Sequence, residues 1–203
     1  MTAALELIRR DGADSLSMRQ LAKQLGVTPM TIYYYVGNKD ALFERCADAV
    51  LARVPRPTPT GRDWHNEVKT CAMHGFRLLL EYPGLCAEIV KRPPSQQNAA
   101  LASYGVAILV AAGFDAVAAG KATLVIQTFV FGMIGLQAQL ERAQRNAHKA
   151  RNKRRPNDDI LLTFNVPALV DFGLEAMLIG LRDKLGRSSR TKPRSAGTRV
   201  RSA

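Results

Sequence analysis

The stretch SMRQLAKQLGVTPMTIYYYVGNKD at residues 17–40 constrains the fold more than any other part of the chain. Leu21, Ala22 and Leu25 recur at helical spacing and predict one apolar helix face. Gly26 ends this helix, because a helix C-terminus often needs a residue without a β-carbon in the left-handed conformation. We therefore expect a short helix that stops at residue 25 and turns sharply.

A second short helix is predicted directly after this turn. Thr28 is a suitable N-cap, and Pro29 fits the first turn, where no backbone N–H is needed. Ile32 and Val36 lie four residues apart and point back to the core. A short, rigid helix with hydroxyls and aromatic rings outside suits a DNA groove better than a protein core. The outward residues are Met30, Thr31, Tyr33 and Tyr34.

This stretch resembles the DNA-binding segment of the TetR (tetracycline-repressor) family of transcriptional regulators. The matching elements come in order at fixed spacing: LAKQLGV at 21–27, a threonine ahead of the tyrosines at 33–35, and NKDAL at 38–42. The close match covers roughly residues 1–50, and beyond it the resemblance is one of architecture. It implies an all-α protein, with an N-terminal three-helix helix-turn-helix domain and a C-terminal helical domain for ligand binding and dimerisation.

The resemblance also assigns DNA contacts to individual positions. Arg19 carries a fork of donors for a guanine edge or a phosphate, and TetR itself has an arginine at the matching place. TetR relatives use the positions of Tyr33 and Tyr34 for phosphate and base contacts. They place a phosphate-binding lysine at Lys39, and Tyr35 replaces a histidine common in the family. The candidate DNA-binding residues are Arg19, Thr28, Pro29, Met30, Thr31, Tyr33, Tyr34, Tyr35 and Lys39.

The alternative interpretation places the three tyrosines in the core and leaves Lys39 as solvated surface. Successive residues of a helix step about 100° around its axis, so three consecutive aromatic residues cannot all face one core. At least one tyrosine should therefore be exposed. Because a single reading helix covers only a few base pairs, specific binding favours a homodimer on a palindromic DNA operator.

Helical periods dominate the rest of the chain, and strand-like alternation is scarce. We expect domains at 1–54 and 64–185, joined by a proline-rich linker at 55–63 and followed by a basic disordered tail at 186–203. A polar, basic stretch at 146–159 is predicted to be a mobile loop. The predicted helices run over about 2–10, 18–25, 29–35, 39–54, 64–82, 85–91, 96–112, 115 to beyond 141, and 167–185.

The chain shows no run of about 20 apolar residues without polar breaks, so no membrane span is expected. The amphipathic start does not read as a signal peptide, and the short first helix favours a true start upstream of Met1. Cys46, Cys71 and Cys86 show no paired spacing, which favours free thiols in a cytoplasmic protein. They are either buried and inert or part of a redox switch.

The net charge of +12 suggests a polyanionic partner, but most of it lies away from the tyrosine-bearing helix. Residues 142–155 hold seven basic residues and no acid, and residues 186–203 hold six and no acid. The rest of the chain is close to neutral. The tail either attracts phosphate non-specifically or serves only solubility, so charge gives weak support for a DNA site at 17–40.

The helix predicted near 115–141 is apolar nearly all round up to Leu140, so it must be buried on several sides, and the helix at 167–185 is apolar on two faces. Gly132 and Gly135 would permit close approach of another helix. The resemblance implies that both helices pair with their symmetry mates in a four-helix dimer interface. The alternative is that they form only the core of one chain.

The resemblance also implies a ligand pocket between the helices predicted at 64–82, 96–112 and 115–141. Gln127 is the most suggestive residue, because it is polar within an apolar run. The apolar surroundings imply a hydrophobic or aromatic effector of unknown identity. Each candidate residue has simple core contact as its alternative role. The candidate lining is Met73, Phe76, Leu80, Tyr104, Gln127 and Phe131.

Cys71 and His74 lie one helical turn apart with His65 nearby, but no further ligands follow at metal-binding spacing. We expect no metal and no cofactor. No nucleophile–base pair, phosphate-binding glycine loop or paired-carboxylate site is found, so we expect no enzyme.

The sequence therefore predicts a one-component transcriptional regulator, a repressor released from its operator by a small hydrophobic molecule. Three alternatives stay open. The first is a DNA-binding regulator without a ligand, and the second is a metabolite-binding protein or enzyme with a vestigial helix-turn-helix. The third is a nucleoid-type binder that acts through the basic tail.

Overall fold

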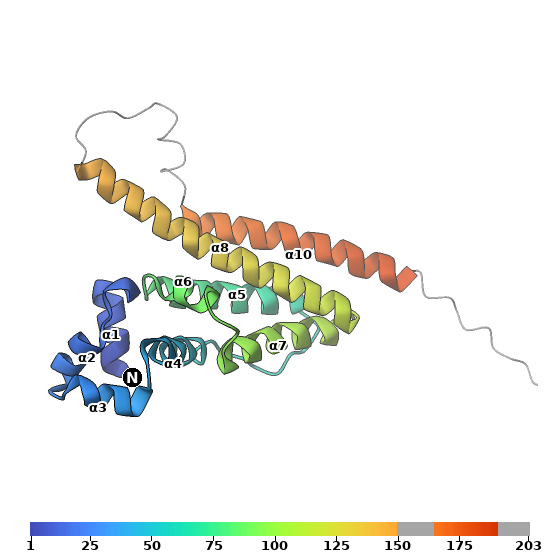
Figure 1. Ribbon diagram of the computed structural model, residues 1–203. Helices are drawn as coiled ribbons and strands as arrows, with labels where there is room; N and C mark the ends of the chain where they lie inside the picture. Colours follow the sequence, from blue (N-terminus) through green and yellow to red (C-terminus); the bar gives the residue numbers. More distant parts are fainter. Residues whose placement is uncertain (150–164, 191–203) are drawn as a thin grey trace, which may run out of the picture.

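The computed structural model describes residues 1–149 and 165–190, with side chains described to residues 144 and 184. The described residues contain helices and turns and no strand, so the predicted all-α class is confirmed. Short helices gather at one end, and the long helices α8 and α10 cover the other elements on one side (Figure 1). The elements are α1 (Thr2–Asp11), η1 (Ala13–Ser15), α2 (Met18–Leu25), α3 (Pro29–Val36), α4 (Lys39–Leu51), α5 (Trp64–Leu80), α6 (Leu85–Val90), α7 (Gln96–Ala111), α8 (Ala116–Lys149) and α10 (Val166–Arg190).

The starts and ends of α2, α3 and α4 follow from capping chemistry. Ser17 accepts the backbone N–H of Gln20 at 3.2 Å and begins α2. Gly26 ends α2 in the left-handed conformation with φ of 67°. Thr28 and Asn38 cap α3 and α4 in the same way as Ser17, through bonds from backbone N–H groups three residues on.

The N-terminal helices enclose a small apolar core. Ile8, Leu21, Ile32 and Leu42 are buried, one from each of α1 to α4. The prediction that Leu25 shares the inward face of α2 is wrong, because this side chain is 50% exposed. The buried face of α2 lies one turn earlier and consists of Met18, Leu21 and Ala22, at the spacing i, i+3, i+4.

Helix α4 connects the N-terminal helices to the rest of the molecule. It contacts α3 at one end and also packs against α5, α6 and α7. Phe43, Cys46, Val50 and Leu51 of α4 are all buried. Since one continuous set of buried apolar residues runs from α1 through α4 into α10, a displacement of α4 must be felt on both sides.

Helices α8 and α10 run side by side as a long outer pair (Figure 1). Gly173 of α10 makes this close approach possible, since a β-carbon there would lie 2.3 Å from the Phe129 ring of α8. Val166, Val170, Leu174 and Leu178 form the buried stripe of α10, at spacings of four residues. The inner face of α8 packs against α5, α6 and α7.

Two helix ends differ from the sequence-based expectations. Helix α8 continues to Lys149, so the first residues of the loop predicted at 146–159 are helical. Helix α10 continues to Arg190, past the tail boundary predicted at residue 185. Two general rules explain these later ends. Basic residues stabilise the last turn of a helix through the helix dipole, and a glycine ends a helix only where it adopts the left-handed conformation. The remainder of that loop and residues 191–203 of the tail lie outside the described residues.

The sequence-based expectation that no segment is apolar enough to span a membrane is corrected for α8. Residues 116–144 of α8 are long and apolar enough to cross a bilayer, and a third of the most apolar window is buried in this chain. A core helix passes the same test of length and composition, and α8 packs against four other helices here.

Candidate nucleic-acid interface and internal cavity

The outer face of α3 carries large side chains that contact little else in the chain. Met30 is 75% exposed, Tyr34 is 83% exposed and Tyr35 is 69% exposed, whereas Ile32 between them is 6% exposed. Tyr33 is about half exposed, and its ring is therefore partly held against the chain. The alternative of three tyrosines sealed in the core is excluded, because the helix turns them outward and uses Ile32 as its anchor.

The two threonines of this helix have defined local roles. Thr28 accepts the N–H of Thr31 as N-cap, and the two hydroxyls bond to each other at 2.9 Å. In the first turn of α3, Pro29 has no N–H and those of Thr31 and Ile32 are bonded to Thr28, so the N–H of Met30 is the one left to meet a phosphate. Arg19, Pro29 and Thr28 are exposed, and Thr31 is half-buried.

Lys39 lies at the first position of α4, next to the end of α3. Its ammonium group is 5.4 Å from the centre of the Phe43 ring, which steadies the chain by cation–π attraction while leaving the residue exposed. The guanidinium of Arg92 lies 5.4 Å from the same ring centre and pairs with Asp40. The N-terminus of α4 is therefore tied to the segment after α6 at the residue that follows Lys39.

Arg92 is held by a second carboxylate. Its Nη1 is 2.8 Å from Oε2 of Glu88, and Lys91 lies 2.8 Å from the other oxygen of Glu88. Burial acts to raise the pKa of Glu88, but the hydrogen bonds from Lys91 and Arg92 outweigh it, so this pKa lies below its usual range. The Glu88 carboxylate is thus charged at neutral pH and anchors Arg92 beside α4.

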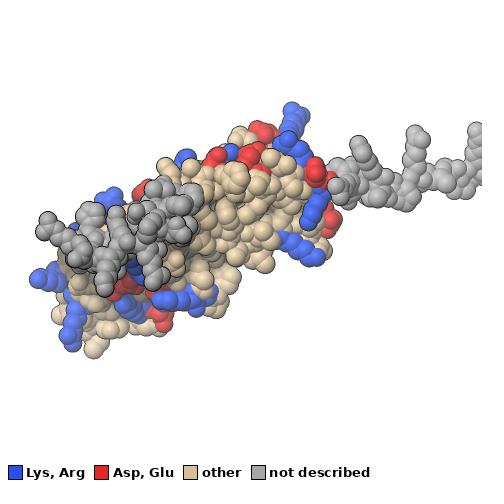
Figure 2. All heavy atoms as spheres, turned by 90° about the horizontal axis from the view of Figure 1, so that it is seen from above, with Lys and Arg blue, Asp and Glu red and all other residues tan. Residues whose placement is uncertain are grey.

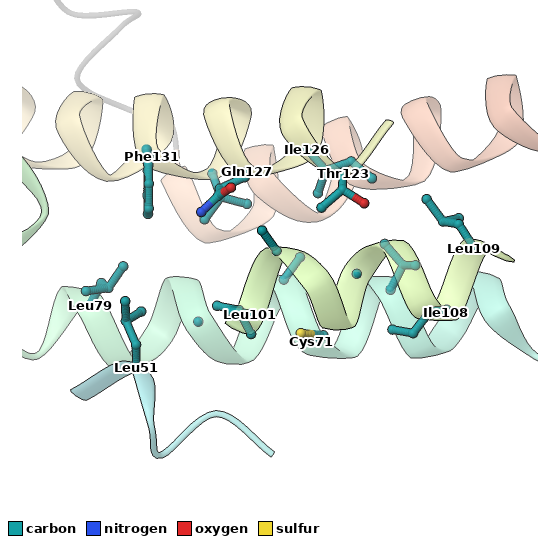
Figure 3. A pocket seen from close by; sticks show the side chains of 16 residues that line it. Leu51, Cys71, Leu79, Leu101, Ile108, Leu109, Thr123, Ile126, Gln127 and Phe131 are labelled. Carbon is teal, nitrogen blue, oxygen red and sulfur yellow. The ribbon is translucent and has the colours of Figure 1, made fainter. Parts of the chain in front are cut away.

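A cavity of about 80 Å³ lies beneath α8. It lies between α5, α7 and α8, and Leu51 of α4 is part of its lining (Figure 3). The lining is almost wholly apolar, and its polar side chains are Thr123 and Gln127, with the thiol of Cys71. The lining residues are Leu51, Val68, Cys71, Ala72, Gly75, Leu79, Leu101, Ala102, Gly105, Ile108, Leu109, Thr123, Ile126, Gln127, Val130 and Phe131.

The structure divides the sequence-based candidates for the lining into two groups. Gln127 and Phe131 face the cavity, whereas the other four do not line it. Met73 and Phe76 are buried in the core, and Leu80 and Tyr104 pack against that core. The bulky side chains fill space, whereas the cavity has open space beside Gly75, where an added β-carbon would meet no atom within 4 Å. Thr123, missed earlier, lies four residues before Gln127, so helical spacing alone could have found it.

The two polar side chains of the cavity differ in their hydrogen bonding. The Thr123 hydroxyl oxygen is buried without a partner in the chain. Gln127 donates through Nε2 to Oδ1 of Asn98, a buried residue of α7. The Oε1 atom of Gln127 is then the acceptor available to the cavity.

Hydrogen bonds continue from Gln127 toward α4. The N–H of Asn98 bonds to Oγ of Ser95, the N-cap of α7, at 3.3 Å. Ser95 donates its hydroxyl to Oδ1 of Asp48 in α4, and the N–H of Gln97 donates to the same oxygen at 3.1 Å. A polar path, Gln127–Asn98–Ser95–Asp48, therefore joins the cavity to the helix that carries Lys39.

The three thiols are unreactive at neutral pH. Burial raises the pKa of Cys46 and Cys71 to about 11 and that of Cys86 to about 12. A protonated thiol is a weak nucleophile, which favours inert cysteines over the redox alternative. No group of three or more metal-ligating side chains occurs among the described side chains of residues 1–144 and 165–184, and His65 pairs with Glu175 at 3.2 Å.

Two family models account for most of the chain. The model described as "Bacterial regulatory proteins, tetR family" matches residues 1–46, and "Tetracyclin repressor-like, C-terminal domain" matches residues 56–185. The chain belongs to the TetR family. The resemblance found in residues 17–40 is confirmed, and the family identifies this protein as a DNA-binding transcriptional regulator.

Relatives and solved structures agree with this assignment. An HTH-type transcriptional regulator of Saccharopolyspora erythraea is 33% identical over 176 residues, covering 83% of this chain and 73% of that protein. The apo structure of ActR from Streptomyces coelicolor aligns with a TM-score of 0.75 at 23% identity, covering 92% of this chain and 94% of the other. A TetR variant from Acinetobacter baumannii in complex with minocycline aligns with a TM-score of 0.69 at 25% identity, covering 91% and 94%.

Proposed function

We propose that this TetR-family regulator is a cytoplasmic repressor that binds a palindromic operator as a homodimer and releases it when a small apolar molecule enters the cavity. Residues 1–54 form the DNA-binding domain, 55–63 the linker, and 64–185 the regulatory and dimerisation domain. The observation that carries the proposal is the outward face of α3, where exposed aromatic and apolar side chains surround one buried isoleucine. The chain acts by binding, without catalysis.

The residues that meet DNA divide into two kinds. The tyrosines and Met30 offer flat or apolar surfaces and phenolic donors to base edges and backbone, and Lys39 offers a charge to phosphate. Arg19 lies at the start of α2 and is exposed. The proposed contacts are Arg19, Thr28, Pro29, Met30, Thr31, Tyr33, Tyr34, Tyr35 and Lys39.

The homodimer is supported by an apolar surface on α8 and α10. Figure 2, which views the molecule from the side of these helices, shows a broad uncharged surface with charged residues at its margins. Leu124 and Val125 of α8 and Phe172 and Ile179 of α10 are each more than half exposed in the single chain. An apolar surface of this kind marks a contact with another protein. Pairing of these helices with a second copy would cover it.

Opposition between ligand and DNA requires an element that both sites bias. Helix α4 meets this requirement, because it begins with Lys39 beside α3 and ends with Leu51 in the cavity wall. The polar path from Gln127 to Asp48 and the pair Arg92–Asp40 both hold α4 against the body. A ligand that widens the cavity would shift α4 and misplace the two reading helices of the dimer.

The cavity itself supports a small-molecule effector. The similar Acinetobacter baumannii variant was solved in complex with minocycline, in the same fold at a TM-score of 0.69. The cavity of this chain is mainly apolar, and residues of α4, α5, α7 and α8 line it. Mainly apolar concave sites with few polar groups are typical of small-molecule binding, but at roughly 300–1,000 Å³ they are several times larger than this cavity, so a ligand must widen it.

Selection of bound DNA from a random pool tests the proposal. We expect a palindromic sequence, bound by two copies of the chain, whose enrichment disappears with Tyr34→Ala or Lys39→Ala. Enrichment of non-palindromic or random DNA, unchanged by these variants, would show that binding does not use the outer face of α3. Once the operator is known, a library of small molecules is screened for compounds that release it. If none does, the proposed response to a ligand is wrong, but the proposed binding to the operator still holds.

A further inference from the structure

The cavity restricts the chemistry of its ligand, on the basis that the proposed ligand response is correct. We propose that the ligand is an uncharged, mainly apolar molecule with one group that both donates and accepts a hydrogen bond, such as a hydroxyl, and that Thr123 and Gln127 hold this group. The remainder of the molecule contacts aliphatic and aromatic side chains of α5, α7 and α8.

The absence of charge follows from the lining. Among its sixteen residues none carries a charge, and the Cys71 thiol is protonated, since burial raises its pKa to about 11. An ionised ligand group would lose its water without gaining a counter-charge in the wall, which is strongly unfavourable. Arg56 lies close enough to act electrostatically on Cys71, so an anionic ligand is the main rival. The guanidinium of Arg56 already bonds to Gln97 at 2.8 Å.

The polar group follows from two atoms. The Thr123 hydroxyl is buried without a partner, and a buried polar group of this kind is stabilised when it gains one. The Gln127 amide uses Nε2 for Asn98 and keeps Oε1 free to accept. Figure 3 shows Thr123 and Gln127 projecting from α8 toward α5 and α7, one helical turn apart. A hydroxyl can donate to Gln127 and accept from Thr123, and it would still fit if the amide were turned over.

Room for the ligand depends on glycine. A β-carbon added to Gly75 of α5 would meet no atom within 4 Å, so it would project into open space of the cavity that Gly75 lines. At Gly105, by contrast, an added β-carbon would come within 2.9 Å of the Thr123 methyl group. Gly75 is therefore the position at which a larger side chain fills the cavity without disturbing the polar pair.

The test uses ring-matched probes on the full-length dimer at pH 7. The one-ring probes are phenol, benzene, benzoate and benzylammonium, and the two-ring probes are 2-naphthol, naphthalene and 2-naphthoate. Calorimetry and the shift in thermal midpoint report binding. We expect each phenolic probe to bind about 2- to 10-fold more tightly than its hydrocarbon, as for one added hydrogen bond. No charged probe should bind at the same concentration.

Variants assign the selectivity to the two side chains. Thr123→Val with Gln127→Leu should remove the advantage of phenol over benzene while keeping the affinity for benzene. Thr70→Val is the control, because Thr70 is an exposed threonine of α5 outside both the lining and the proposed dimer surface of α8 and α10, and it should keep the advantage. Gly75→Leu should abolish binding of every probe. Gly75→Ala, which adds one methyl group, should weaken binding of the two-ring probes and serves if the leucine variant folds poorly.

Three results would overturn the proposed ligand class: tighter binding of a charged probe than of the phenolic one, an unchanged phenol advantage in the double variant, or no binding of any probe. The outcome is separable from the proposed function by measuring operator affinity in parallel. If a charged molecule releases the operator, the proposed chemistry of the ligand is wrong, but the proposed response to a ligand still holds. If phenol binds selectively but operator affinity does not change, the proposed response is wrong, but the proposed chemistry of the ligand still holds.

Discussion

The outer face of α3 presents large side chains from neighbouring positions of one helix, whereas the cavity is lined mainly by small and aliphatic side chains from four helices. The first region needs only the local periodicity of an eight-residue helix and one buried anchor, Ile32. The second needs α4, α5, α7 and α8 to be in place before any empty volume exists. The comparison shows why a surface for a large partner can be located from the chain order, and why an internal site is hard to locate that way.

The largest effect is expected for Phe76→Ala, which tests whether Phe76 belongs to the core or to the ligand site. Phe76 is wholly buried and lies outside the cavity lining, so we expect a loss of about 3–5 kcal/mol in the free energy of unfolding. Denaturant titration at fixed protein concentration measures it, because dimerisation adds to apparent stability. A small loss of stability together with a large loss of ligand affinity would place Phe76 in the ligand site instead of the core.

Tyr34→Ala tests the other region. We expect operator affinity to fall by about 1–3 kcal/mol and the free energy of unfolding to change by less than about 0.5 kcal/mol, since the ring contacts solvent in the free protein.

The charge beside α3 is tested separately. Lys39→Ala should weaken operator binding and reduce the slope of log affinity against log salt by about one. Lys121→Ala removes the same charge from an exposed site on α8 and serves as control. Equal effects of the two lysine variants would show that only net charge matters.

The path between the two regions is tested by Asp48→Ala. The carboxylate of Asp48 caps α7 through Ser95 and Gln97, so its loss should uncouple α4 from the cavity. We expect the drop in operator affinity caused by ligand to shrink by about 1 kcal/mol, roughly 5-fold, while operator affinity without ligand is nearly unchanged. Gel shift with and without 2-naphthol measures both quantities.

The matched control for this prediction is Asp115→Ala. Asp115 caps α8 by accepting the N–H groups of Val117 at 3.1 Å and Ala118 at 2.9 Å, far along the chain from α4. Both variants lose a carboxylate cap, which costs about 0.5–2 kcal/mol of stability. If Asp115→Ala reduces the coupling as much as Asp48→Ala does, then general loosening of the body carries the effect and the polar path does not.

Gly75→Ala separates stability from function within the cavity. Replacing a glycine in a helix interior by alanine should raise the free energy of unfolding by about 0.5–1 kcal/mol, because the added β-carbon meets no atom within 4 Å. The same methyl group reduces the cavity volume and should weaken binding of two-ring phenols. Gly120→Ala in α8 has equally open surroundings and lies outside the lining, so it should stabilise without changing ligand affinity. Destabilisation by Gly75→Ala would show that this space is filled.

The smallest expected effect is on the acid side of the stability curve. The pKa of Glu88 is lowered in the folded state, so its stabilisation is fully present above the usual glutamate pKa and is lost as pH falls through the lowered value. Glu88→Gln should therefore lower stability at neutral pH and flatten the decline between about pH 5 and pH 3. Denaturant midpoints across this range give the result. Parallel curves for the two proteins would mean that Lys91 and Arg92 do not act on this carboxylate.

Helix boundaries and the outer face of α3 could be predicted because each depends on residues close in sequence. Ser17, Thr28 and Asn38 act as N-caps, and Gly26 adopts the left-handed conformation that its place after Leu25 predicts. The prediction for Leu25 was wrong because a side chain at the end of a helix is buried only if another element covers it. The continuation of α10 to Arg190 was missed because composition gives no definite stop there.

The amino-acid sequence alone determined the fold class, the three N-terminal helices and the side of α3 that meets solvent, because short-range periodicity and capping suffice for these. Only the tertiary structure decided which residues line the cavity, that Thr123 is buried without a partner, and that Gln127 is linked to Asp48 through Asn98 and Ser95. A cavity is the space that several helices leave unfilled, and a hydrogen-bonded path needs atoms far apart in sequence to meet. Neither depends on residues that are neighbours in the chain, so the order of residues does not reveal them.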